Sequence, residues 1–269
     1  MLIKRFDAMN VIRIYGGLGN QLFQYAFGRA QEENGIEVRY EDSWYHRKQP
    51  RKYPRPCVLN KLHTHVQYSP FLNQTLVKQT TGYSLDLLKK ENANFDGYWQ
   101  YLPYFKDILP ILRKEFIVKE EFHTPQFLQL KKEIETCPSV SIHVRRGDYL
   151  THGGVFRNLK FEYYYNALKG NTGDLFIFSD DIPWCKEMFT QDYFSNRITF
   201  VDLHDYLSFE LMKLCKEHIV SNSTYSYWAA LLSGNSTKCP QHWLGEQEID
   251  TKELQYPKEW VKMEDYVIY

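Results

Sequence analysis

The sequence lacks a net charge and a long hydrophobic run, and we expect no secretory leader. Its 33 Lys and Arg residues balance 33 Asp and Glu residues, so no overall field draws the chain to nucleic acid. No window of about 20 apolar residues predicts a transmembrane helix. Lys4, Arg5 and Asp7 interrupt the amino terminus before a signal sequence could form. We therefore expect a cytoplasmic protein with at most peripheral contact to the inner face of the membrane.

Cysteine is scarce, and the common nucleotide motifs are missing. Leu22 stands where the last glycine of a GxGxxG motif would be, and no GxxxxGK loop occurs. The five cysteines are odd in number and have no CxxC spacing, so they favour neither a disulfide framework nor a zinc site. They are Cys57, Cys137, Cys185, Cys215 and Cys239. Reduced thiols are the simplest interpretation.

The sequence does contain short apolar runs that alternate with helical patterns. An apolar run at residues 11–15 ends in a glycine-rich turn, and a helical pattern follows at 21–33. Gly35 ends this helix, and a second run at 36–40 completes a predicted β-α-β unit.

The second half of the chain repeats this alternation. Apolar runs at 140–144, 175–178 and 218–220 are separated by helical patterns at 161–168 and 206–216. Such runs predict a parallel sheet that helices cover on both faces. Ligands of these sheets bind beyond the carboxyl ends of the strands, which is where the most informative residues lie.

The middle of the chain suggests a boundary between two lobes. Residues 43–70 lack a periodic pattern and are interpreted as an irregular surface region, in which the basic segment 44–52 has no assigned role. Residues 118–125 are interpreted as the crossing. The predicted lobes are residues 1–120 and 121–269, with the extreme carboxyl terminus expected to pack back on the first lobe.

The first candidate site is the glycine-rich turn at residues 16–21. Glycines let the backbone turn sharply and approach a ligand, and Asn20 can cap the following helix. Free amides at that helix start would favour a phosphate. A purely structural turn is an equally good interpretation.

The second candidate is the segment 141–149, in which His143 precedes Arg145, Arg146 and Asp148 at the end of a predicted strand. Adjacent arginines repel one another unless an anion lies between them. A diphosphate suits them, because guanidinium groups bind phosphate oxygens bidentately and need no metal. Pairing with Asp148, or a solvated loop, is the alternative.

The third candidate is Asp180 and Asp181, which follow a buried strand. Carboxylates there can accept hydrogen bonds from ribose hydroxyls or guanine, or bind a metal. Their spacing is not DxD, so we expect no required metal. Capping of a helix ahead of Pro183 is the alternative.

The fourth candidate is the hydroxyl-rich segment 221–226, which includes Ser221, Ser223 and Thr224 and precedes an apolar helical run at 227–232. Hydroxyls and amides at a helix start are donors to phosphate oxygens. N-capping alone would account for one of these hydroxyls.

Four segments together resemble the shared motifs of the bacterial alpha-1,2-fucosyltransferases. They are GGLGNQLFQYAFG at 16–28, HVRRGD at 143–148, FIFSDD at 176–181 and SNSTYSYW at 221–228, in the same order as in that family. Residues 95–100, FDGYWQ, resemble a further family segment. The resemblance extends from about residue 9 to about residue 243.

The resemblance implies an α/β fold of the GT-B kind, with two Rossmann-like lobes whose parallel sheets face a central cleft. It also implies an inverting transfer of L-fucose from GDP-fucose to the 2-hydroxyl of a β-galactoside, without a metal or other cofactor. The implied partners are GDP-fucose and a galactose-terminated oligosaccharide or lipid-linked glycan, as in O-antigen or lipopolysaccharide synthesis.

The resemblance also suggests roles for individual residues. The first lobe would serve the acceptor and the second the donor. Arg145 and Arg146 would hold the diphosphate, with Arg145 the more essential. Asp148 and His143 are further catalytic candidates, although no general base can be identified. The substrate-binding candidates are Gly17, Gly19, Asn20, Gln21, Trp99, Arg145, Arg146, Asp180, Asp181, Ser221, Ser223 and Thr224.

Three alternatives stay open from the sequence. Trp99 could stack on the acceptor sugar or pack in the core. The chain could bind a GDP-sugar or a glycan without turnover, or it could transfer another GDP-sugar.

Overall fold

A computed structural model describes residues 8–47, 55–79, 83–151, 157–243 and 256–268. The chain divides into two compact units, which we call the first unit (Met1–Ile117 with Lys252–Gln255) and the second unit (Val118–Thr251 with Tyr256–Tyr269). Among the described residues, no helix is both long and apolar enough to cross a membrane.

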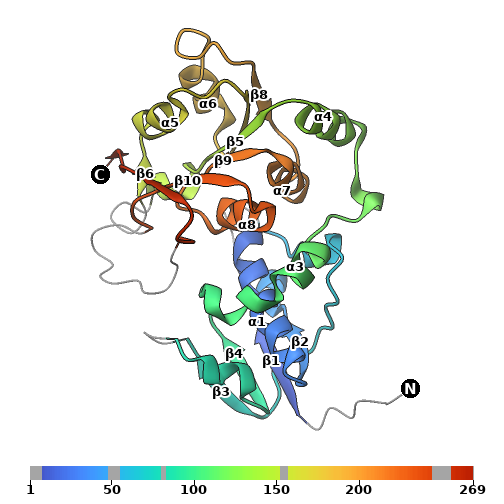
Figure 1. The fold of residues 1–269 in the computed structure, drawn as a ribbon. Coiled ribbons are helices and arrows are strands. Elements are labelled where there is room, and N and C mark those ends of the chain that lie inside the picture. The colour runs from blue at the N-terminus through green and yellow to red at the C-terminus, as the bar shows by residue number, and fades with distance from the viewer. Residues whose placement is uncertain (1–7, 48–54, 80–82, 152–156, 244–255, 269) are drawn as a thin grey trace. The chain divides into compact units, whose positions relative to one another are not determined.

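The first unit contains a four-stranded parallel sheet (Figure 1). Its strands are β1 (Met9–Arg13), β2 (Glu37–Glu41), β3 (Thr75–Lys78) and β4 (Ala93–Asp96), in the order β2-β1-β4-β3. Its α-helices are α1 (Leu18–Glu33), α2 (Ser43–His46) and α3 (Leu109–Glu115). Short 3-10 helices occupy Leu59–Lys61, Leu85–Lys89, Leu102–Tyr104 and Lys106–Ile108.

Helix α1 packs tightly against the first sheet because Gly28 faces it. A Cβ atom at Gly28 would lie 2.7 Å from both Ile12 Cδ1 and Tyr40 Oη. The side chains of Leu22 and Phe27 fill the remaining space and are fully buried. The predicted β-α-β unit is therefore present, but the helix begins at Leu18 instead of residue 21.

Two other expectations for the first unit were wrong. Gly17, not Asn20, is the N-cap of α1, because Asn20 already lies in its first turn. The segment 43–70 is not wholly a surface region, since Val58 and Leu59 are buried. In the basic segment 44–52, the short helix α2 covers the start, and residues 48–52 lie outside the described residues.

The second unit contains a six-stranded parallel sheet. Its strands are β5 (Ser139–Val144), β7 (Asp174–Ser179), β8 (Ile198–Val201), β9 (Glu217–Ile219), β10 (Ser236–Pro240) and β11 (Val261–Met263), in the order β11-β10-β9-β5-β7-β8. β6 (Asn158–Leu159) and β12 (Val267–Ile268) form a small antiparallel pair. Strand β11, near the carboxyl terminus, pairs with β10 within this unit.

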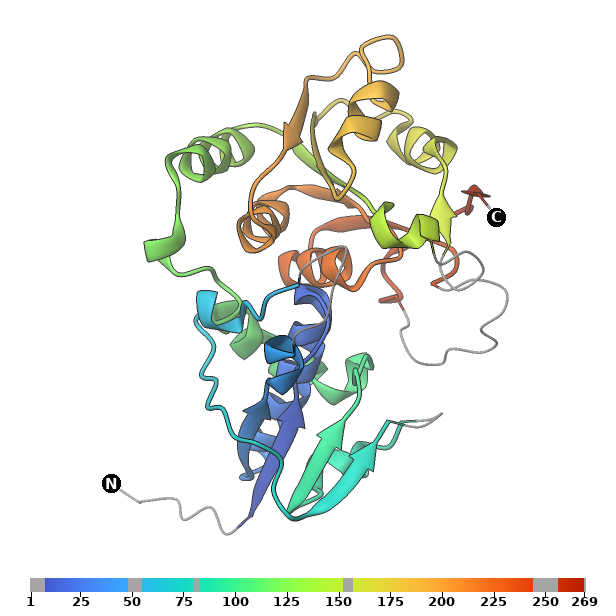
Figure 2. The same ribbon diagram turned by 180° about the vertical axis from the view of Figure 1, so that it is seen from behind.

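Helices lie on both sides of this sheet. They are α4 (Pro125–Thr136), α5 (Phe161–Leu168), α6 (Ile182–Met188), α7 (Asp205–Leu214) and α8 (Thr224–Ser233), with 3-10 helices at Glu120–Phe122 and Gly147–Thr151. In Figure 2, α5 and α6 cover one face, and α4 and α7 cover the other. The predicted α/β architecture, with a parallel sheet in each half of the chain, is confirmed.

Each sheet has one point where the direction of chain progression reverses. In the second unit the chain runs from β5 outward to β7 and β8, then returns to β9 on the other side of β5. In the first unit β1 is followed by β2 on one side and has β4 on the other. Loops after the two strands diverge at such a point and leave a crevice that suits a ligand. We call these two positions the switch points of the sheets, and we expect ligand sites there.

Candidate active site

The arginine and aspartate motifs of the second unit meet at the carboxyl edge of its sheet. Strand register brings them together, because Val144 at the end of β5 pairs with Ser179 at the end of β7. Arg145 and Arg146 follow the first strand, and Asp180 follows the second, so the charged residues leave the sheet side by side.

The two arginines are held by three carboxylates. Arg145 places Nη2 2.6 Å from Asp148 Oδ1 and Nη1 2.9 Å from Asp180 Oδ2. Arg146 places Nε 3.0 Å from Asp181 Oδ2, and its backbone amide donates to Asp180 Oδ1 at 2.9 Å. The anions that separate the guanidinium groups are therefore protein carboxylates, as the alternative interpretation expected. Asp148 pairs with Arg145.

Arg146 keeps one buried donor without a partner among the described residues. Its Nη1 atom makes no hydrogen bond, and its guanidinium lies 4.1 Å from the centre of the Trp184 ring. A buried, unsatisfied donor on a charged group costs on the order of 1–3 kcal/mol or more. An anionic oxygen that reached Nη1 would remove that cost, so this atom supports an anion site.

Tyr149 connects the arginine segment to the hydroxyl-rich segment. The Arg145 guanidinium lies 5.3 Å from the centre of the Tyr149 ring, and the Tyr149 hydroxyl donates to the carbonyl of Asn222 at 2.9 Å. Tyr149 was not among the predicted site residues, although it directly follows Asp148 in the motif. This tyrosine joins the loops that follow β5 and β9, the two strands of the switch point.

The hydroxyl-rich segment leads into helix α8. Ser223 is the N-cap of α8 but makes no side-chain capping bond, and Thr224 is its first residue. Ser221 is buried, and its Oγ lies 2.7 Å from His143 Nδ1. Ser221 is therefore a buried hydrogen-bond partner of His143. Ser223 and Thr224 lie at the start of α8, where backbone amides can reach an anion.

His143 is neutral at physiological pH. Burial, and then the positive charge of Arg145, lower its pKa to about 3. A general base works best when its pKa lies near the operating pH, so this imidazole is too weak for that task. Its environment suits hydrogen bonding better than proton transfer.

The glycine-rich turn forms part of the switch point of the first sheet. Gly16 has a φ of 86°, which a glycine adopts without strain. Gln21 is fully buried and shapes this turn, because its side-chain amide donates to the carbonyls of Gly16 and Pro56 and accepts from Val58 N. Gly19 is buried within α1. Gly17 is half-buried.

Trp99 is a core residue in this structure. Its indole is 1% exposed and stacks on Phe27, with 4.6 Å between ring centres. This placement matches the core-packing alternative and leaves no ring face for a sugar. Asn20 is half-buried and accepts a hydrogen bond from Gln100 Nε2 at 3.0 Å.

We expect the stability of the second unit to fall as the pH is lowered from about 6.5. Burial lowers the pKa of His218 to about 3, as it does for His143. The unfolded chain binds protons near pH 6.5, so between these values it binds more protons than the folded chain, and acid favours unfolding. Each histidine should remove on the order of 2 kcal/mol by pH 5.

Urea unfolding at pH 7 and pH 5 tests this expectation. His218→Asn keeps an amide near the position of Nδ1, which contacts Ser141 Oγ at 2.7 Å. This variant should lose part of the pH dependence of the free energy of unfolding. An unchanged dependence would contradict the prediction.

The fold is α/β, with a parallel sheet and a switch point in each unit, and the charged cluster lies at the carboxyl edge of the second sheet. The family model for glycosyl transferase family 11 matches residues 3–264, so the chain belongs to that family. The predicted resemblance to the fucosyltransferases is thereby confirmed at the level of the family. Within the described part of the chain, no group of three or more His, Cys, Asp or Glu side chains is arranged as a metal site.

Two relatives from Escherichia coli are similar along most of their length. An alpha-1,2-colitosyltransferase is 29% identical, over 94% of this chain and 98% of its own. The O-antigen biosynthesis glycosyltransferase WbnK is 25% identical, over 85% of this chain and 92% of its own.

Solved structures share the fold. The alpha-1,6-fucosyltransferase NodZ from Bradyrhizobium, in crystals soaked with GDP-fucose, aligns with a TM-score of 0.54 at 11% identity over 84% of this chain and 92% of its own. A family 9 glycosyl transferase from Veillonella parvula aligns with a TM-score of 0.51 at 8% identity, over 97% of this chain and 88% of its own.

Proposed function

We propose that the chain transfers L-fucose from GDP-fucose to the 2-hydroxyl of a β-galactoside, with inversion, in the synthesis of a surface glycan such as an O-antigen. The observation that carries this proposal is the arginine pair at the switch point of the second sheet, with its unsatisfied buried donor on Arg146. The names of the relatives support it, since one is an alpha-1,2-transferase and the other acts in O-antigen biosynthesis.

The second unit would bind the donor. As the bond between fucose and GDP breaks, the sugar gains oxocarbenium character and negative charge grows on the diphosphate. Arg145 and Arg146 would stabilise that charge, and their carboxylate partners fix the guanidinium groups beforehand, so little reorganisation is needed during the reaction. Two arginines can serve a diphosphate without a metal, so we propose a metal-independent transfer.

The carboxylates have a narrower role in this proposal than the sequence suggested. Asp180 and Asp181 are engaged by the arginines, and Asp181 also accepts from Trp184 N at 3.2 Å, which caps α6. Each carboxylate has further lone pairs that a ribose hydroxyl or guanine could use. Their first task is to orient the arginines.

A related candidate donor is GDP-colitose. Colitose is L-fucose without its 3-hydroxyl, and a relative that is 29% identical is named for colitosyl transfer. The two donors share the diphosphate and guanosine, so the arginine site suits both. The non-catalytic alternative is a protein that binds a GDP-sugar or a glycan and does not turn it over.

The test is GDP release from GDP-fucose with lactose as acceptor, with and without EDTA. Parallel reactions omit lactose or replace the donor with GDP-colitose or GDP-mannose. Lactose-dependent release that EDTA does not change supports the proposal, and NMR of the product reports the linkage. Faster release from GDP-colitose would reassign the donor. GDP binding without release, for any donor and a panel of galactosides, would favour the binding protein.

A further inference from the structure

Three aromatic rings lie in a row at the carboxyl edge of the first sheet. Each comes from the first residues after a strand: Trp44 after β2, Tyr15 after β1 and Tyr98 after β4. These strands are neighbours in the order β2-β1-β4. Because parallel strands end at the same edge, the rings follow the order of the strands. They span the switch point between β1 and β4, where such a sheet offers a crevice.

The rings are in contact, and one is well exposed. The Tyr15 ring centre lies 6.3 Å from that of Trp44 and 4.7 Å from that of Tyr98, and the rings are tilted to one another. Tyr98 is 39% exposed, while Tyr15 and Trp44 are half-buried. A packed core would bury such rings, so their partial exposure in a continuous row needs another explanation.

The backbone that presents Tyr98 is strained. The next residue, Trp99, has a φ of 56°, which is rare for a large side chain. Gln79 holds this conformation, because its Oε1 atom accepts from Tyr98 N at 2.7 Å and from Trp99 N at 2.9 Å. A Cβ atom at Gly97 would lie 2.5 Å from Gln79 Cβ, so glycine permits this close approach. Strain of this kind is concentrated at functional sites.

Neutral polar groups lie beside the aromatic row. The side-chain amide of Gln100 donates a hydrogen bond to that of Asn20. Asn20 Nδ2 also lies against Gly16, which is the residue that follows Tyr15 in the chain. Amides and tyrosine hydroxyls are donors and acceptors for sugar hydroxyls. Rings that offer an apolar face with a polar rim match a pyranose, which has an apolar C–H face and a rim of hydroxyls.

We propose that Tyr15, Trp44 and Tyr98 form a platform on which a hexopyranose ring of the acceptor glycan stacks. This inference rests on the proposed function and assigns the acceptor to particular residues of the first unit. It replaces Trp99, which is buried, with its exposed neighbour Tyr98 as the aromatic contact. A stacked nucleobase is the competing occupant that the experiment must separate.

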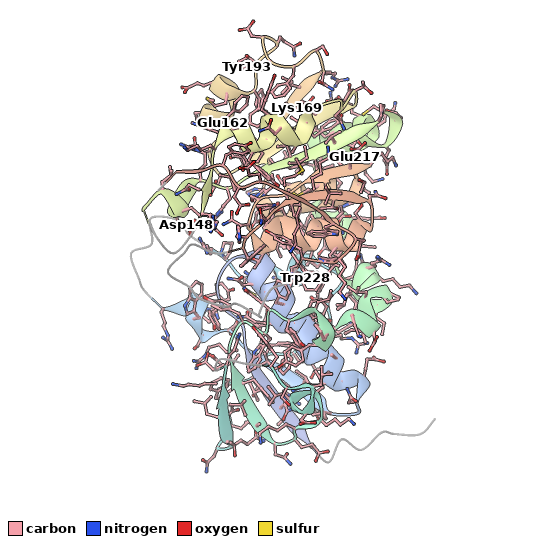
Figure 3. The ribbon with its side chains drawn as sticks, turned by 60° about the vertical axis from the view of Figure 1, so that its left-hand side comes forward. Asp148, Glu162, Lys169, Tyr193, Glu217 and Trp228 are labelled. Carbon is pink, nitrogen blue, oxygen red and sulfur yellow. The ribbon has the colours of Figure 1, made fainter. Side chains whose placement is uncertain are left out.

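The kinetic test uses Tyr98→Ala in the full chain. Tyr165→Ala is the matched control, because Tyr165 is also 39% exposed and also contacts other aromatic rings, including Tyr193. Figure 3 shows Tyr193 far from Asp148 in the second unit. Tyr98→Ala should raise the KM for lactose roughly tenfold, with an unchanged Kd for GDP. A rise in the Kd for GDP without a change in the KM for lactose would overturn the proposal.

A binding measurement separates this proposal from the proposed function. Saturation-transfer NMR with lactose, N-acetyllactosamine and galactosyl-β1,3-N-acetylgalactosamine reports glycan contact without turnover. We expect a signal for the unaltered chain and for Tyr165→Ala, and its loss in Tyr98→Ala. If this pattern appears while no GDP-sugar is turned over, glycan binding by the platform is supported and the proposed transfer reaction is rejected. A signal that Tyr98→Ala retains, or no signal for the unaltered chain with any of these glycans, would refute the platform.

Discussion

Arg145→Ala is expected to lower turnover at least about a hundredfold. The Arg145 guanidinium is fixed by Asp148 and Asp180 at the carboxyl edge of β5, where the charge of a departing diphosphate would develop. Loss of one preorganised donor to such a charge typically costs about 2.7–4 kcal/mol in the transition state. The measurement is kcat for GDP release, with the Kd for GDP determined separately.

Two further variants separate chemistry from folding. Arg145→Lys keeps a positive charge but loses the forked donor, so it should recover only part of the activity. Arg197→Ala removes an arginine that also pairs with a carboxylate, Glu133, but lies elsewhere in the second unit and is largely exposed. It should keep full activity. Near-normal turnover in a folded Arg145→Ala protein would show that the diphosphate assignment is wrong.

Asp180→Ala is expected to lower kcat/KM at least about tenfold. Asp180 holds Arg145 through one oxygen and the Arg146 amide through the other, so its loss removes one of the two carboxylates on Arg145 and the acceptor of the Arg146 amide. Gly147 packs closely on this carboxylate, because a Cβ there would lie 2.4 Å from Asp180 Oδ2. Asp180→Asn, which keeps the shape and an acceptor oxygen, should be less damaging. Asp192→Ala, an exposed aspartate of the same unit, is the control.

Inhibition by fragments of the donor distinguishes two roles for Asp180. If it orients Arg145, the variant should bind pyrophosphate more weakly and guanosine as before. If it recognises ribose or guanine, as the sequence also allowed, guanosine affinity should fall and pyrophosphate affinity should persist. Equal affinities of Asp180→Ala and the unaltered chain for both fragments would contradict either role.

Much of the second unit could be predicted from the sequence. The helical pattern at 161–168 coincides with α5, and the apolar runs at 140–144 and 175–178 lie inside β5 and β7. The two strands are buried on both faces and the helix on one face, so hydrophobic pattern alone identifies them. The short strands β3 and β10 were not predicted, because β3 is mostly exposed and β10 is polar at its start.

The candidate site was only partly predictable. The arginines and aspartates were expected at one sheet edge because they directly follow apolar strands. The pairing of the arginines with Asp180 and Asp181 was not expected, because it depends on the register that sets Val144 opposite Ser179. The row of Tyr15, Trp44 and Tyr98 was missed for a similar reason, since it exists only when three distant strands become neighbours.

The sequence by itself determined the α/β class, the family and the location of the chemical groups at strand ends. These follow from local hydrophobic pattern and from motifs, which are properties of contiguous residues. Only the tertiary structure decided that Asp180 pairs with Arg145, that His143 is neutral and that Trp99 is buried while Tyr98 is exposed. Burial, register and pKa arise from residues distant in the chain, so no local pattern encodes them.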